Sequence, residues 1–179
     1  MKDRVIQPDT KDWTWVLERR CEECGYDAAA VTTSDVAGAI RANAAAWQVV
    51  ELTAIRPDER TWSSLEYACH VRDVLVLYRE RLDLMTTQDD PLYPNWDQDE
   101  SAIVERYAEQ DPSTVQRELQ DAAAAIAGRF DGLSEAEWQR PGRRSDGASF
   151  TVDTFSRYFL HDVVHHLHDV SPSRDPAGG

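Results

Sequence analysis

Apolar residues recur at every third or fourth position in four long stretches of the chain. This spacing predicts helices with one apolar face each, because side chains three or four positions apart lie on the same side of a helix. A Ser, Thr or Asp in front of good helix-forming residues marks where the first three helices begin. The predicted helices cover residues 33–54, 63–85, 111–132 and 150–170.

Since no stretch has a convincing strand pattern, the sequence predicts an all-α fold, a single four-helix bundle over residues 33–170. An N-terminal extension (residues 1–32) precedes the bundle, and a disordered tail (residues 171–179) follows it. The connection at residues 86–100 is too long for a minimal turn, and a short helical piece at 101–109 follows it. The second and third helices therefore need not be antiparallel neighbours.

Two further segments carry weaker structural signals. In the extension, Trp13, Trp15 and Leu17 alternate with polar or smaller residues, as in a short extended piece. Before the last helix, the polar segment 141–149 contains two glycines, which predicts a flexible loop.

Composition and charge narrow the class of protein. The formal net charge of -14 would repel a phosphate backbone, so no nucleic-acid partner is expected. No apolar run of 18 residues could span a membrane, and the first residues lack the apolar core of a signal peptide. The cytoplasm is therefore the expected compartment, with no membrane partner. Three cysteines, an odd number, argue against a disulfide framework.

Four of the five histidines lie in the last predicted helix. His161 and His165 are four residues apart, so both imidazoles can point to one place, as metal ligands do. His168 falls near the same face, whereas His166 is turned about 100° from His165. The alternative is a solvated histidine cluster near a helix C-terminus, where the helix dipole favours cations.

His70 lies in the apolar stripe of the second predicted helix, so it should face the core. A lone inward histidine is usually a hydrogen-bonded core side chain. One histidine from this helix and two from the last would instead form a three-histidine metal site with an open position, as in catalytic zinc sites. Asp73 and Asp162 lie within one turn of these histidines and could orient imidazoles or be surface spectators.

Cys21 and Cys24 form a CxxC motif followed by Gly25. This motif is half of a structural zinc site or the core of a dithiol redox site. The chain has no second CxxC and no strand–helix context of the thioredoxin kind. A structural or weakly metal-binding turn is therefore favoured, with redox chemistry as the alternative.

Two loops could contribute to a binding site. Tyr93, Trp96 and Asp97 lie in the long connection and could line a pocket, or belong to an ordinary acidic surface loop. A dense basic cluster near the last helix could attract an anionic substrate, or be solvated. Its members are Arg140, Arg143 and Arg144.

Three motifs carry a family resemblance: W-S-x-x-E-Y-x-x-H ending at His70, the segment PNWDQDE, and F-L-H-D-V-V-H-H ending at His166. Together they resemble the DinB/YfiT-like superfamily of metal-binding four-helix bundles, in particular actinobacterial members that begin with TWVLERxCxxCG. The resemblance implies a down-up-up-down bundle, a homodimer, and a divalent metal such as zinc or nickel. It also implies that the metal ligands are His70, His161 and His165.

The same resemblance implies a function. The superfamily includes mycothiol-dependent maleylpyruvate isomerase and S-transferases that use mycothiol or bacillithiol. We therefore expect a metal-dependent thiol S-transferase whose partners are a small-molecule thiol and an electrophilic substrate. A metal-dependent hydrolase is a second possibility, and a non-catalytic metal-binding stress-response module is a third. A closed site with a fourth ligand such as His168 would favour the module.

Overall fold

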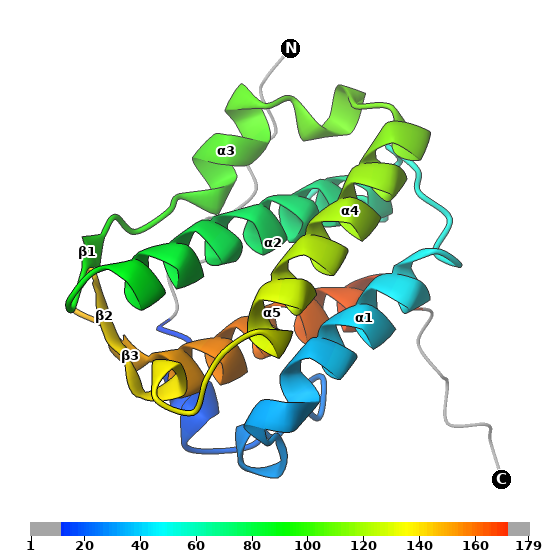
Figure 1. The fold of residues 1–179 in the computed structure, drawn as a ribbon. Coiled ribbons are helices and arrows are strands. Elements are labelled where there is room, and N and C mark those ends of the chain that lie inside the picture. Colours follow the sequence, from blue (N-terminus) through cyan, green and yellow to red (C-terminus); the bar gives the residue numbers. More distant parts are fainter. Residues whose placement is uncertain (1–11, 172–179) are drawn as a thin grey trace, which may run out of the picture.

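The computed structural model describes residues 12–171, and all structural statements below concern this part of the chain. Four long helices form the body of the molecule (Figure 1): α1 (Val36–Trp47), α2 (Ser64–Thr87), α4 (Pro112–Asp131) and α5 (Val152–Val170). Helix α4 packs against α1 and α2, and α5 packs against the same two helices. Each long helix therefore has two long neighbours, and the apolar faces meet in one core.

The helix starts follow from local sequence. At α2 the Ser63 hydroxyl accepts a hydrogen bond from the Glu66 amide, and the Glu66 carboxylate accepts one from the Ser63 amide. This reciprocal pair satisfies two amides that the first turn leaves without partners. Asp111 caps α4 through the Thr114 amide, and Pro112 fits the first helical position because it has no amide hydrogen. The predicted starts of α2 and α4 are confirmed.

Helix α1 ends at Trp47, seven residues before the predicted end at Ala54. The residues that follow bond to the start of α2 instead of continuing the helix. The Thr53 amide donates to the Ser64 hydroxyl, and the Thr53 carbonyl accepts from the Leu65 amide. These contacts join segments 11 or 12 positions apart, so helical periodicity alone could not show them.

A small three-stranded sheet corrects the all-α prediction. Its strands are β1 (Leu92–Tyr93), β2 (Pro141–Arg144) and β3 (Ser149–Thr151), in the order β1-β2-β3. Strand β1 runs parallel to β2, and β2 pairs antiparallel with β3 in a hairpin whose turn contains Gly147 at φ +100°. The segment predicted as a flexible loop is thus a hairpin against the end of α2, and the chain is mostly helical.

The described part of the N-terminal segment folds onto α5. It contains three short 3-10 helices, η1 (Thr14–Leu17), η2 (Ala28–Ala30) and η3 (Thr33–Asp35), of which η1 and η2 contact α5. The extended piece predicted around Trp15 is therefore wrong. The helical piece expected after the long connection is present as α3 (Gln98–Val104) and η4 (Tyr107–Glu109). The predicted tail lies outside the described residues except for Ser171.

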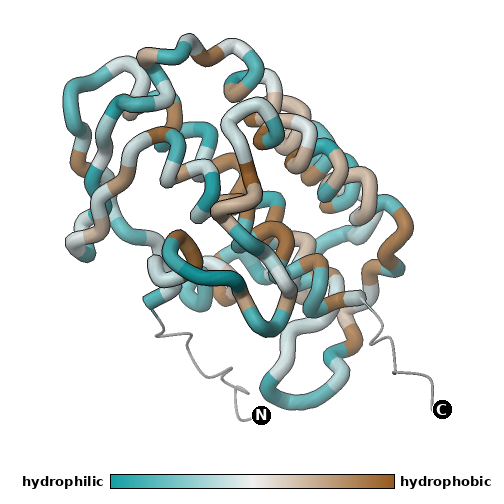
Figure 2. The backbone as a smooth tube through the Cα atoms, turned by 90° about the horizontal axis from the view of Figure 1, so that it is seen from below, coloured by the Kyte–Doolittle hydropathy of each residue, from teal (hydrophilic) through white to brown (hydrophobic). Residues whose placement is uncertain are grey.

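Figure 2 shows apolar positions interleaved with polar ones along the helices, as amphipathic helices require. The apolar positions form one core in which the largest fully buried side chains include Trp47, Tyr107, Phe155 and Phe159. None of the described helices combines the length and the apolar character needed to cross a membrane.

Candidate functional site

A cleft of about 1040 Å³ opens between the long connection, the hairpin, the N-terminal segment and one face of α5. Its walls carry aromatic rings, carboxylates and three arginines. Trp96 and Asp97 line it, as predicted for the long connection, whereas Tyr93 is buried. The residues that matter most for its chemistry are Tyr67, Arg81, Arg144, Tyr158, Asp162 and His166.

Asp162 and His166 line this cleft and buried His70 lies against them; we name these three residues the cleft cluster. One ligand atom from each lies within 4.8 Å of the others. Oδ1 of Asp162 is 3.3 Å from Nε2 of His70 and 3.0 Å from Nε2 of His166. His70 is fully buried, as predicted, and the indole of Trp96 stacks on its ring with 5.4 Å between centroids.

Burial and mutual contacts shift the pKa of every member of the cleft cluster. Burial would raise the pKa of Asp162, but hydrogen bonds from His166 and His70 hold it well below its ordinary value. Burial would lower the pKa of His166, yet its contacts with the carboxylates of Asp162 and Asp169 raise it to about 9. Burial lowers the pKa of His70. The carboxylates of Asp162 and Asp169 therefore favour the protonated form of His166.

The donor atoms of the cleft cluster fit a divalent cation. Zinc binds imidazole nitrogen and carboxylate oxygen at about 2.0–2.2 Å, so two neighbouring ligand atoms lie about 3.0–3.5 Å apart. The two distances to Oδ1 of Asp162 fall in this range. Two imidazoles and one carboxylate also form a familiar metal-binding set that leaves positions open.

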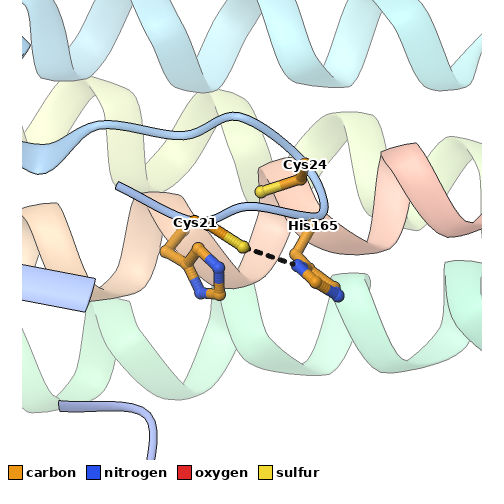
Figure 3. A group of neighbouring side chains, drawn as sticks. Cys21, Cys24 and His165 are labelled. Atoms are coloured by element: carbon orange, nitrogen blue, oxygen red, sulfur yellow. Dashed lines mark hydrogen bonds between the residues drawn. The ribbon is translucent and has the colours of Figure 1, made fainter. Parts of the chain in front are cut away.

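A second group, which we name the Cys-His cluster, contains Cys21, Cys24, His161 and His165. Figure 3 shows the two cysteines on the N-terminal loop close to His165 on α5. The sulfur of Cys21 lies 3.7 Å from Nδ1 of His165. The Trp13 ring covers both imidazoles, with its centroid 5.4 Å from each.

The two clusters separate the three histidines that the resemblance implied as one ligand set. The structure brings His161 and His165 together, but it places His70 with Asp162 and His166 instead. The reason is the rotation of α5: successive residues are turned by 100°, so positions 161 and 165 turn toward the N-terminal segment while 162 and 166 turn toward α2, and all four line the cleft. His168 is exposed and belongs to neither cluster.

Sequence reasoning undervalued two members of the cleft cluster. Asp162 and His166 are themselves four residues apart, and this spacing was the signal that could have identified them. Asp73, considered as an orienting partner, bonds Arg72 and Tyr107. Of these two aspartates, it is Asp162 that contacts imidazoles.

Positive charge in the cleft comes from exposed Arg60 and from the more buried Arg81 and Arg144. Arg81 is only 4% exposed, donates to the Pro94 carbonyl, and packs over the rings of Tyr78 and Tyr93. No carboxylate among the described residues forms an ion pair with it, and burial lowers its pKa. Its place in the core stripe of α2 was the sequence signal that was missed.

Of the predicted basic cluster, Arg144 alone reaches the cleft, where it pairs with Asp146 and donates to the Tyr158 hydroxyl. Arg140 donates to the carbonyls of Met85 and Gln88. Arg143 pairs with Asp90. Two of the three arginines therefore hold the hairpin against the end of α2.

Comparison with known proteins shows the family of this chain. The family model of the DinB superfamily matches residues 18–170, a range that includes both clusters and all four long helices. The chain belongs to the DinB superfamily. A DinB-superfamily assignment agrees with the mostly helical fold and the histidines on facing helices. No curated protein matches the chain significantly.

Among solved structures, this DinB-superfamily chain is similar to YfiT from Bacillus subtilis, with a TM-score of 0.69 and 16% sequence identity. The likeness covers 77% of this chain and 83% of that chain. YfiT is described as a probable metal-dependent hydrolase with an unusual four-helix bundle topology. At this identity the likeness shows a shared fold.

Proposed function

We propose that this DinB-superfamily protein is a metal-dependent enzyme whose cation is held by His70, Asp162 and His166. One observation carries the proposal: three donor atoms of a metal-binding set lie within 4.8 Å of one another beside a large cleft. A three-ligand site at a cleft wall leaves a coordination position for a small molecule, as catalytic sites require. Zinc and nickel are the cations we expect.

Neighbouring side chains hold these ligands in place. Nδ1 of His166 lies 3.0 Å from Asp169, which fixes the ring so that Nε2 faces Asp162. The Trp96 indole covers the ring of His70 and shields it from water. When bound, a divalent cation supplies Lewis-acid chemistry by lowering the pKa of a thiol or water at its open position.

Arg81 indicates that the substrate carries an anionic group. A buried guanidinium without a carboxylate partner is costly, and an anion entering the cleft would neutralise it. Arg144 and the Tyr158 hydroxyl line the same cleft, interact electrostatically with Arg81 and supply further donors. Recognition of a carboxylate by arginine is strengthened by the planar, multi-donor guanidinium.

The size of the cleft favours a reaction between two molecules. Sites for single small molecules have volumes of about 300–1000 Å³. A cleft of about 1040 Å³ lies just above this range and has room for a low-molecular-weight thiol and an electrophile together. We therefore favour thiol S-transfer, in which Arg81 orients the anionic electrophile and the thiol is the nucleophile.

Hydrolysis is the second candidate, because the structurally similar YfiT is described as a probable metal-dependent hydrolase. Hydrolysis would use the same cation at the cleft cluster, and Arg81 would again bind the anionic group of the substrate. The difference is the nucleophile, which would be water. The two candidates therefore differ in whether a thiol is needed.

The test compares wild type with Asp162→Asn and with His168→Ala, which changes an exposed histidine of the same helix. Each protein is loaded with zinc or nickel, its metal content is measured, and electrophiles are offered with and without thiols. Metal-dependent consumption that requires a thiol supports S-transfer, and thiol-independent consumption supports hydrolysis. Equal metal content in wild type and Asp162→Asn would overturn the proposed cation site.

A further inference from the structure

The CxxC loop and α5 bring two thiols and two imidazoles together on the side of α5 that faces the N-terminal segment. We propose that Cys21, Cys24, His161 and His165 form a second metal site, a closed tetrahedral zinc site separate from the cleft cluster. The four candidate ligand atoms lie within 4.8 Å of one another. Two cysteines and two histidines are one of the common ligand sets of structural zinc.

The one distance between donors across the two elements supports this site. At tetrahedral zinc, with Zn–S of about 2.3 Å and Zn–N of about 2.0 Å, sulfur and nitrogen ligands lie about 3.5 Å apart. The sulfur of Cys21 is 3.7 Å from Nδ1 of His165. Metal binding would thus need only a small adjustment of these two side chains.

The backbone of the loop is already shaped as a metal-binding turn. The Gly25 amide donates to the Cys21 carbonyl, and the Cys21 amide donates to the Tyr26 carbonyl. Gly25 has φ +77°, a conformation that a residue with a side chain adopts only with strain. The tight turn keeps both cysteines on the side of α5, as Figure 3 shows.

Residues around the imidazoles also fit metal ligation. If Nδ1 of His165 binds zinc, Nε2 is left to a carboxylate, and Glu23 lies 3.5 Å from it. Carboxylate–histidine–zinc arrangements of this kind fix the ring and make the imidazole a stronger ligand. Nε2 of His161 is buried and has no hydrogen-bond partner among the described residues, so this imidazole is not committed to another contact.

Burial favours a closed zinc site over a redox dithiol. Cys21, His161 and His165 are all buried, and four protein ligands leave no position for substrate. In a redox pair both sulfurs must take part in disulfide exchange, and although Cys24 is partly exposed, Cys21 is 1% exposed and lies against His165. Two thiolates would also neutralise the charge of a buried Zn²⁺. The site therefore fastens the N-terminal segment to α5 and fixes the rotation of α5 that turns Asp162 and His166 toward the cleft.

The experiment uses the full chain, reduced and loaded with Co²⁺ in place of zinc. Wild type should bind two cations and show the thiolate-to-cobalt charge-transfer band and the visible bands of tetrahedral cobalt. Cys24→Ser should lose one cation together with the charge-transfer band. Cys69→Ser, which changes the remaining cysteine outside the cluster, should keep both cations and the band.

Asp162→Asn separates this inference from the proposed function. It should lose the cation of the cleft cluster and keep the charge-transfer band. Failure of the cleft proposal alone would leave wild type with one cation and an intact band. Reduced, cobalt-treated wild type without the band would overturn the second site, and this measurement stands even if Cys24→Ser does not fold.

Discussion

His165 and His166 are consecutive residues whose imidazoles serve different clusters. Their ring centroids are 6.0 Å apart and their planes are nearly perpendicular, at 89°. His165 turns to the sulfur of Cys21, whereas His166 turns to the carboxylate of Asp162. One turn of α5 therefore forms a wall shared by two candidate metal sites.

Alanine at each of these two positions should remove a different cation. We expect His165→Ala to lose the cobalt charge-transfer band and to keep the cleft cation. His166→Ala should keep the band and lose the cleft cation, because its Nε2 faces Asp162. Metal analysis and cobalt spectra, with exposed His168→Ala as the control, check this. Loss of the same cation in both variants would contradict the two-cluster arrangement.

Arg81→Met should weaken anion binding without destabilising the fold. Hydrogen bonds to a charged group contribute about 1.5–3 kcal/mol, so binding of a simple dicarboxylate such as succinate should weaken about 10- to 100-fold. Thermal stability should stay equal or rise, because methionine removes an unpaired buried charge. Fluorescence of Trp62 and Trp96, which line the cleft, can report the titration.

The matched control for Arg81→Met is Arg143→Met, which changes a half-exposed arginine of the hairpin paired with Asp90. It should leave succinate binding unchanged. Equal weakening in the two variants would mean that general charge, rather than the buried guanidinium, attracts the anion.

Glu66→Gln should destabilise the fold in a pH-dependent way. Arg56 donates to both carboxylate oxygens of Glu66, and glutamine would keep the cap on Ser63 but lose the charge. Burial raises the pKa of Glu66, but the hydrogen bonds from Arg56 and Ser63 outweigh burial and leave it below the usual 4.5. We expect a loss of about 2–3 kcal/mol near pH 7, less than for a fully buried pair because Arg56 is partly exposed.

The sign of the pH dependence follows from the lowered pKa. The stabilisation is complete above the unfolded-state pKa and disappears as pH falls through the folded-state pKa. Urea unfolding at several pH values should therefore show the difference between wild type and Glu66→Gln shrinking below about pH 4.5. A difference that does not change with pH would show that the charge contributes nothing.

Gly142→Ala should destabilise the contact between the hairpin and α2. A Cβ at this position would lie 2.7 Å from Cγ of Met85, a side chain that is itself fully buried. Overpacking of this kind costs about 1–3 kcal/mol. In a double-mutant cycle the added Cβ should cost less in a Met85→Ala background. Additive losses in the free energy of unfolding would contradict the contact.

The long helices could be predicted because their signals are local. Caps such as Ser63 and Asp111 and the apolar stripes depend on neighbours within four residues. The sheet could not be predicted this way, because β1 pairs with β2 across the chain, Leu92 with Arg143. Its strands have two to four residues, too few to show an alternating pattern.

The candidate site was predictable in its parts but not in its grouping. Helical spacing correctly brings His161 and His165 together, and the core stripe correctly buries His70. Spacing cannot tell which face of α5 meets α2, because that rotation is set by packing with the N-terminal segment and the other helices. His70 therefore meets the pair one residue further on, Asp162 and His166.

The proximity of Cys21 and His165 has a consequence for the unfolded chain. The two residues are 144 positions apart, so a metal that joins them closes nearly the whole described polypeptide into a ring. By analogy with a covalent cross-link, closing a loop of this length costs the denatured ensemble about 5 kcal/mol of conformational freedom. Such a ring would also oppose fraying from either end, and chelators would convert a cyclic topology into a linear one.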